Sequence, residues 1–304
     1  MKAFFAKLLL FGEYGLMFGA RALALPFNRY SGMLVKPGAT AFDTDARQSS
    51  VELERFASWF QHEQLNAKMN FPLDLERLRQ DITGNLYFRS DIPLEYGLGS
   101  SGALCAALFD EYSIYCRDPL YVGKKHSLPE ALKHDFSVME SYFHGKSSGL
   151  DPLVSFFHQP VLFENNHILL PHVTNEKLGF QVCLIDTGAP GATSPLVSRF
   201  LEKMQDPDFN LVFNSDYLPA NDGAVQAFLA RQPDQLFRYL RLITRFQLDY
   251  LTEMIPAGIA DHIEQLLSHG ICVKLLGSGG GGFLLAFIPA DADAGLLRNA
   301  QRAF

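Results

Sequence analysis

Residues 93–103 constrain this chain most, because they combine three glycines and two serines and lead directly into an apolar segment. Glycine lets a backbone turn sharply and approach a ligand without a Cβ clash. Ser100 and Ser101 stand where a helix over 103–115 would begin, and a helix N-terminus attracts anions through its N–H groups and its dipole. The stretch therefore predicts a phosphate cradle, with an ordinary glycine-rich loop as the alternative.

Length and charge bound the class of protein. A chain of 304 residues can form two domains, at roughly 100–200 residues each. Its 48% hydrophobic and 19% charged residues are typical of a globular protein. A net charge of −7 argues against binding to nucleic acid or to an anionic membrane. An anionic ligand would have to be held by local features such as helix ends, a few lysines or a metal ion.

Targeting signals and cysteines favour a cytoplasmic protein. No apolar run reaches the ~20 residues of a membrane helix, and Lys7 interrupts the apolar N-terminal run that superficially resembles a signal peptide. The four cysteines are scattered without a C-x-x-C pair, which indicates reduced thiols rather than a disulfide framework or structural zinc.

The first half of the chain mixes strand and helix patterns. Hydrophobic periodicity and turn residues predict strands over 7–11 and 86–92 and helices over 73–83, 103–115 and 129–143. Residues 22–27 form a further apolar segment. The segments 32–42 and 50–56 suit further strands or a strand and a helix start. Ser127 is expected to cap the helix over 129–143. Residues 144–152 should form a polar loop, in which Pro152 biases Asp151 away from helical geometry.

The second half is predicted to form a separate domain, with a boundary near residue 175. A strand over 180–186 precedes amphipathic segments at 196–204, 225–229, 236–251 and 259–267. The chain ends in a hairpin, with strands over 271–276 and 283–288 and a glycine turn over 277–282. The predicted domains are 1–175 and 176–304.

Two segments, 97–102 and 277–282, match the dinucleotide pattern G-x-G-x-x-G. The second precedes a strand instead of a helix, and the acidic residue after the first, Asp118, follows its helix with no second strand. A nicotinamide or flavin site is therefore disfavoured. A Walker-type loop is excluded, because no Gly-Lys-Ser or Gly-Lys-Thr occurs.

Phosphoryl transfer needs a phosphate cradle, a carboxylate for Mg²⁺, a group that orients the acceptor hydroxyl, and a cation. Glu140 and Asp151 flank a Gly- and Ser-rich loop that could bring both carboxylates to one point, and Lys7 is the cation candidate. Taken singly, each carboxylate suits a solvated surface and Lys7 suits the end of a strand.

Read together, the motifs resemble a family. The stretches 7–19, 93–103 and 274–282 look like the three signature motifs of the GHMP kinases, in the family order. The loop 140–151, with Glu140, His144-Gly145, Ser148-Gly149 and Asp151, further resembles the mevalonate kinase branch. The resemblance implies an α+β fold with a ribosomal-protein-S5-like N-terminal domain, a ferredoxin-like C-terminal domain and an active site in the cleft between them.

The same resemblance implies roles for individual residues. Asp151 and Lys7 would be catalytic, and Ser101 and Glu140 would hold Mg²⁺. The remaining expected contacts are with ATP phosphates (Gly97, Leu98, Gly99, Ser100, Ser101, Gly102), with the acceptor (Glu13, Tyr14, His144, Thr193) and in support of the cradle (Gly277, Gly279, Gly280, Gly281).

The expected activity is transfer of a phosphoryl group from ATP to the hydroxyl of a small acid, with mevalonate as the expected acceptor. Mevalonate kinases usually carry Gly-Glu-His in motif one, whereas this chain has Tyr14 in the third position. The motifs therefore define the identity of the acceptor less closely than they define the family. Phosphomevalonate, a sugar or homoserine are the alternative acceptors, and a non-catalytic sensor that binds ATP or a metabolite is the alternative class. The expected partners are ATP, Mg²⁺ and the small acceptor; a homodimer is compatible with the sequence.

Overall fold

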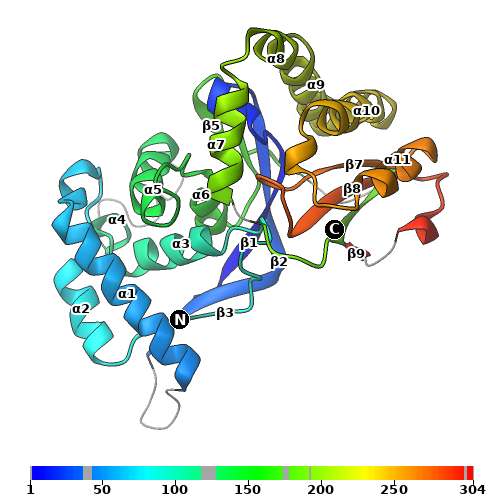
Figure 1. Ribbon diagram of the computed structural model, residues 1–304. Coiled ribbons are helices and arrows are strands. Elements are labelled where there is room, and N and C mark those ends of the chain that lie inside the picture. The colour runs from blue at the N-terminus through cyan, green and yellow to red at the C-terminus, as the bar shows by residue number, and fades with distance from the viewer. Residues whose placement is uncertain are drawn as a thin grey trace. The chain divides into compact units, whose positions relative to one another are not determined.

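The computed structural model describes residues 2–36, 43–117, 128–173, 178–191, 193–297 and 300–303 (Figure 1). Its contacts divide the chain into two compact units that alternate along the sequence. Unit 1 comprises Met1–Lys7, Leu25–Pro93 and Leu98–Val161, and unit 2 comprises Leu8–Ala24, Leu94–Gly97 and Leu162–Phe304. The predicted domains, 1–175 and 176–304, stay a prediction.

One sheet has the strand order β1 (Phe4–Phe11), β2 (Ala22–Val35), β4 (Val161–Glu164), β5 (His167–Leu169), and β3 (Tyr87–Ser90) pairs with β2. The pairing of β2 with β3 is antiparallel, with Gly32 opposite Ser90. The predicted strands at 7–11 and 86–92 are confirmed within β1 and β3, and the apolar segment 22–27 lies in β2. β1 is almost entirely buried, as expected for a strand whose sequence is continuously apolar apart from Lys7.

The helices of unit 1 are α1 (Thr44–His62), α2 (Leu75–Thr83), α3 (Ser100–Tyr112), α4 (Ile114–Arg117), α5 (Pro129–His144) and α6 (Leu150–Phe157). α3 packs against α5 and α6, and the Phe109 ring lies 4.9 Å from that of Phe136 and 5.6 Å from that of Phe156. A helix that is apolar on nearly every face can be buried in this way. This shared core holds the helix ends that carry the candidate site.

The segment 50–56 lies in α1, so the strand alternative is wrong there. Ser50, Leu53, Phe56 and Phe60 are buried along one side of the helix, which is a helical spacing. Asp43 caps this helix by accepting a hydrogen bond from the Ala46 N–H at 2.8 Å. The predicted cap Ser127 lies outside the described residues.

The prediction for Asp151 was also wrong, because this residue lies in the first turn of α6. Proline is tolerated at the start of a helix, where its missing N–H would have no partner within the helix. Gly149 makes the turn before α6 with a φ of 73°. The side chain of Asp151 is therefore placed by a helix rather than by a polar loop.

Unit 2 contains a second sheet with the order β7 (Cys272–Leu275), β8 (Phe283–Pro289), β6 (Phe180–Asp186), β9 (Ala300–Arg302). Its helices are α7 (Thr193–Lys203), α8 (Pro207–Val212), α9 (Leu218–Leu229), α10 (Pro233–Tyr250) and α11 (Ala260–Ser268). β7 and β8 pair antiparallel, which confirms the C-terminal hairpin. In the described part of the chain, no helix has both the length and the apolar character to cross a membrane.

Replacing Asp135 with Asn is expected to destabilise unit 1. The buried carboxylate accepts hydrogen bonds from the Asn70 N–H at 2.7 Å and the Phe71 N–H at 2.8 Å, and so fixes α5 to the loop before α2. An amide would direct its own N–H groups at one of these donors, so we expect a loss of about 1–3 kcal/mol in the free energy of unfolding. Urea denaturation measures it, with exposed Asp45→Asn as control. An equal loss in both variants would contradict the role of Asp135.

Candidate active site

The phosphate cradle predicted from the sequence ends at the N-terminus of α3. Gly97 and Gly99 have φ values of 76° and 73°, which glycine adopts without strain. The Ala103 N–H donates to the Gly99 carbonyl at 3.0 Å, so Gly99 caps the helix and α3 begins at Ser100. The helix start predicted at the two serines is confirmed, and the binding of phosphate at this end stays a prediction.

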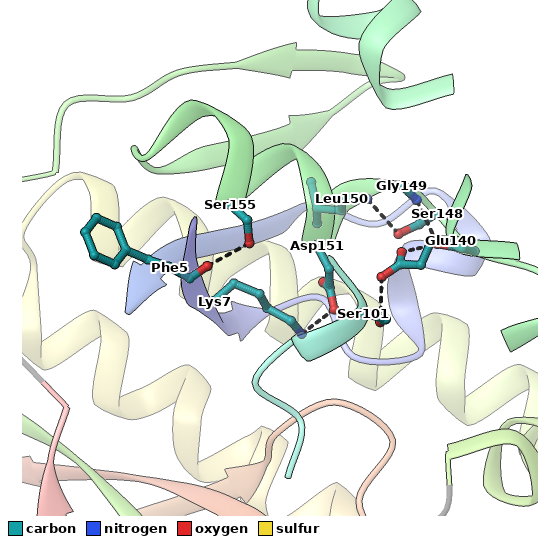
Figure 2. A network of polar contacts seen from close by, with 10 residues as sticks. Phe5, Lys7, Ser101, Glu140, Ser148, Gly149, Leu150, Asp151 and Ser155 are labelled. Carbon is teal, nitrogen blue, oxygen red and sulfur yellow. Dashed lines mark hydrogen bonds and ion pairs between the residues drawn. The ribbon is translucent and has the colours of Figure 1, made fainter. Parts of the chain in front are cut away.

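Lys7 and Asp151 form an ion pair beside the start of α3. The Nζ atom of Lys7 lies 2.8 Å from Oδ2 of Asp151, and Figure 2 shows the two side chains meeting from β1 and α6. The Lys7 side chain is 4% exposed, whereas that of Asp151 is 28% exposed. The lysine side chain is thus buried, while the carboxylate remains partly accessible to solvent.

Two glycines allow this pair to lie against α3. A Cβ atom on Gly99 would lie 2.8 Å from Cγ of Lys7, and one on Gly102 would lie 2.9 Å from the backbone carbon of Asp151. Both distances are shorter than real Cβ contacts permit. The glycines at these positions are therefore required by the close approach of β1, α3 and α6, independently of any ligand.

Glu140 lies at the buried end of the same group of residues. Ser101 donates its hydroxyl to Oε1 of Glu140 at 3.1 Å (Figure 2), and Ser147 donates to Oε2. Burial, followed by the charge of Asp151, raises the pKa of the Glu140 carboxyl to about 8, although both hydroxyls and Lys7 favour its ionised form. The carboxyl is thus poised to gain negative charge when a cation binds next to it.

Ser101 and Glu140 fit a magnesium site that a nucleotide would complete. Mg²⁺ in kinases is bound through one or two carboxylates together with substrate phosphates, and it retains water ligands. One carboxylate and one hydroxyl oxygen in contact match that requirement. Among the described side chains, no group of three or more His, Cys, Asp or Glu residues could hold a metal ion by itself. A dedicated all-protein metal site is therefore not what these residues offer.

The loop between α5 and α6 packs closely on α5, and it contains a contact, made by Ser147, that was not predicted from the sequence. A Cβ on Gly149 would lie 2.1 Å from the Lys133 carbonyl oxygen of α5. The Ser147 hydroxyl accepts from the Gly149 N–H at 3.0 Å while it donates to Glu140, so Ser147 joins the loop to the carboxylate. The run Ser147-Ser148-Gly149 was the available signal, since serines and glycine favour such turns.

Ser155 is a second residue that the sequence did not single out. Its hydroxyl donates to the Phe5 carbonyl at 2.8 Å, which ties α6 to β1 two residues before Lys7 (Figure 2). One turn separates Ser155 from Asp151 on the same helix. This bond therefore helps to fix the register in which the lysine meets the aspartate.

The predicted acceptor-binding residues of motif one belong to unit 2, and their polar atoms are paired within that unit. Glu13 is 2% exposed and Tyr14 is 6% exposed. Lys274 pairs with Glu13 at 2.5 Å, and the Tyr14 hydroxyl donates to the Ser278 carbonyl at 2.6 Å. The other two predicted acceptor contacts, His144 and Thr193, have side chains outside the described part of the structure. Contact of these four residues with an acceptor stays a prediction.

The glycines of the C-terminal turn, which were predicted to support the cradle, lie close to the Leu94–Gly97 segment. A Cβ on Gly97 would lie 2.7 Å from the Leu276 carbonyl oxygen, and Gly277 lies against Gly97 itself. A Cβ on Gly281 would lie 2.4 Å from the Pro190 carbonyl oxygen. Gly279 and Gly280 have φ values of 76°. The turn thus packs closely on the Leu94–Gly97 segment, and its support of a nucleotide stays a prediction.

The chain belongs to the GHMP kinases. The family model for the GHMP kinases N terminal domain matches residues 65–159 and the model for GHMP kinases C terminal matches residues 224–304, together more than half of the chain. The α+β GHMP kinase fold expected from the three motifs is confirmed.

A mevalonate kinase of Dictyostelium discoideum is 21% identical over 247 residues, which are 71% of this chain and 61% of that protein. The chain therefore spans about three fifths of the length of this curated relative. The fold is also similar to L. major mevalonate kinase in complex with R-mevalonate, with a TM-score of 0.60, 15% identity and coverage of 97% and 87% of the two chains. It is similar as well to Streptococcus pneumoniae phosphomevalonate kinase in complex with phosphomevalonate and AMPPNP, with a TM-score of 0.61, 16% identity and coverage of 99% of this chain and 100% of that chain. At these identities the solved structures show the fold alone.

Metal-free protein should lose stability as the pH rises toward 8, through Glu140. The folded carboxyl has a pKa of about 8, against an ordinary pKa of 4.5 for a glutamate in water, so between these values the native state holds a proton that the unfolded chain releases. The stabilisation is complete below about pH 4.5 and is lost by about pH 8, at ~1.4 kcal/mol per pH unit. Glu140→Gln should remove this slope. Urea unfolding in EDTA between about pH 5 and pH 8 measures the difference, and parallel profiles would refute the assignment.

Proposed function

We propose that this chain is an ATP-dependent kinase that phosphorylates the hydroxyl group of a small acid, with mevalonate as the acceptor. The observation that carries the proposal is the Lys7–Asp151 ion pair, 2.8 Å long, against the N-terminus of α3. Membership of the GHMP kinases supports phosphoryl transfer, and the mevalonate kinase relative supports the choice of acceptor.

Asp151 would accept a hydrogen bond from the acceptor hydroxyl and aim its oxygen at the γ-phosphorus of ATP. In a loose transition state the hydroxyl proton leaves late, so orientation matters more than basicity. Lys7 would hold the aspartate in place and offset the negative charge that gathers around the transferred group. Because the Lys7 side chain is so little exposed, water screens its positive charge poorly.

The N-terminus of α3 would face the ATP phosphates with backbone N–H groups and the positive end of the helix dipole. Ser101 and Glu140 would hold Mg²⁺, which supplies charge neutralisation on the phosphate oxygens when bound. The Glu140 carboxyl, with its pKa near 8, would lose its proton on binding the cation.

The acceptor is tested directly with a panel. Purified protein, Mg²⁺ and ATP are combined with mevalonate, phosphomevalonate, galactose or homoserine, and ADP release is followed in a coupled assay. We expect the highest kcat/KM with mevalonate. A higher value for phosphomevalonate would replace the acceptor and leave the kinase proposal intact, whereas no turnover of any of the four would refute the enzyme as proposed and favour the sensor alternative.

Asp151→Asn is expected to reduce kcat by about 10²- to 10⁴-fold, because the acceptor hydroxyl loses both the carboxylate that orients it and its proton acceptor. The amide keeps the size of the side chain but cannot take the proton, while the ATP site at α3 is unchanged, so the Kd for ATP should stay within about twofold of its original value. Asp110→Asn, which affects only an exposed pair with Lys2, is the control. Unaltered turnover in Asp151→Asn would remove this residue from the mechanism.

A further inference from the structure

Unit 2 contains a group of buried polar side chains that the proposed phosphoryl transfer does not use. We call Glu13, Tyr14, Tyr217, Gln247 and Lys274 the Glu13 cluster; each is at most 6% exposed. Polar groups are costly to bury unless they are paired. Their partners therefore indicate what the cluster does.

Glu13 is held through both its side chain and its backbone. Lys274 on β7 places Nζ 2.5 Å from Oε1 of Glu13 and also donates to the Leu275 carbonyl at 2.8 Å. The Tyr217 hydroxyl donates to the Glu13 carbonyl oxygen at 3.1 Å. The two charged side chains are 0% and 1% exposed, so the carboxylate is committed to an internal ion pair.

Tyr217 is presented by an unusual backbone segment. It is the last residue of a π-helical turn, Phe213–Tyr217, inserted between α8 and α9. Such turns are rare and are frequent at functional sites. The Phe213 ring stacks on that of Tyr217 at 5.0 Å. The side-chain oxygen Oε1 of Gln247, on α10, accepts a hydrogen bond from the Leu275 N–H at 2.9 Å. The π turn thus positions the Tyr217 hydroxyl against the Glu13 carbonyl of motif one.

Tyr14 connects motif one to the C-terminal glycine turn. Its hydroxyl donates to the Ser278 carbonyl at 2.6 Å, and its ring stacks on that of Phe200 in α7 at 4.2 Å. The backbone of Tyr14 has a φ of 58°, which is uncommon for a bulky residue and persists only where the surroundings hold it. Both the ring and the hydroxyl are engaged inside unit 2.

The glycine turn that Tyr14 holds lies directly against the first half of the predicted cradle. A Cβ on Gly282 would lie 2.6 Å from Cα of Tyr96, and the Tyr96 ring contacts that of Phe283 at 5.0 Å. Together with the contact between Gly97 and Leu276, these distances leave no space between the turn and Leu94–Gly97. A displacement of the turn would therefore move the cradle backbone.

We propose that Tyr14 is a positioning residue for the phosphate cradle, acting through the Ser278 carbonyl and the Gly277–Gly282 turn, and that it affects the binding of ATP rather than that of the acceptor. Glu13, which is fixed by Lys274 and Tyr217, anchors the motif-one backbone that carries Tyr14. The inference rests on the proposed kinase function and departs from the family expectation that these residues contact the acceptor.

Tyr14→Phe tests the inference, because it removes the hydroxyl and retains the ring on Phe200. We expect the Kd for MgATP, measured by isothermal titration calorimetry, to rise about two- to tenfold, which is the range that one neutral hydrogen bond spans. The KM for ATP should rise in parallel, and the KM for the acceptor should stay within about twofold.

Tyr112→Phe is the matched control, since it removes a hydroxyl that donates to Asp81 at 2.8 Å in unit 1, whereas the Glu13 cluster belongs to unit 2. We expect Tyr112→Phe to lower the thermal stability about as much as Tyr14→Phe does, but to leave the Kd for MgATP unchanged. An unchanged Kd in Tyr14→Phe, or a rise confined to the acceptor KM, would overturn the inference. If the wild-type protein phosphorylates no acceptor of the panel, the proposed function fails, but the calorimetric Kd still decides the role of Tyr14.

Discussion

The N-terminus of α3 lies so close to Lys7 and to the start of α6 that no side chain fits at Gly99 or Gly102. This steric constraint brings a strand and two helix ends together in unit 1 and leaves the Lys7–Asp151 pair at their junction. The body of α3 is buried against α5 and α6, so the helix end cannot withdraw without opening that core. The geometry that we propose for phosphoryl transfer is in this sense a consequence of packing.

The two buried lysines of the strands are used in different ways. Lys7 on β1 pairs with a carboxylate that is 28% exposed, so Asp151 is open to solvent and, in the proposed mechanism, to the acceptor hydroxyl. Lys274 on β7 pairs with Glu13, whose side chain is 0% exposed, so this pair is available only to its own unit. Similar ion pairs therefore support opposite roles, and the exposure of the acidic partner is what separates them.

Much of the candidate site in unit 1 followed from the sequence. The glycines and serines before an apolar segment predicted the start of α3, and the spacing of Glu140 and Asp151 around a Gly- and Ser-rich loop predicted that both carboxylates would converge. Local signals of this kind depend on neighbours in the chain. The helical position of Asp151 was missed because the bias before a proline is weaker than the tolerance of a helix for proline in its first turn. Ser155 was missed because its partner, Phe5, lies far away in the sequence.

The contacts of Glu13 and Tyr14 could not be predicted from the sequence either, because their partners are distant along the chain. Motif one identifies both residues, but their partners, Lys274 and Ser278, are 261 and 264 positions away and are brought near only by the folding of unit 2. The π turn that delivers Tyr217 has no periodic signature of its own within α8 and α9. Once these contacts are known, the replacement of the usual histidine by Tyr14 has a physical meaning, because the phenol hydroxyl lies at the far end of a ring that is stacked on Phe200. The ring spans the distance from motif one to the glycine turn, and the hydroxyl makes the contact with Ser278.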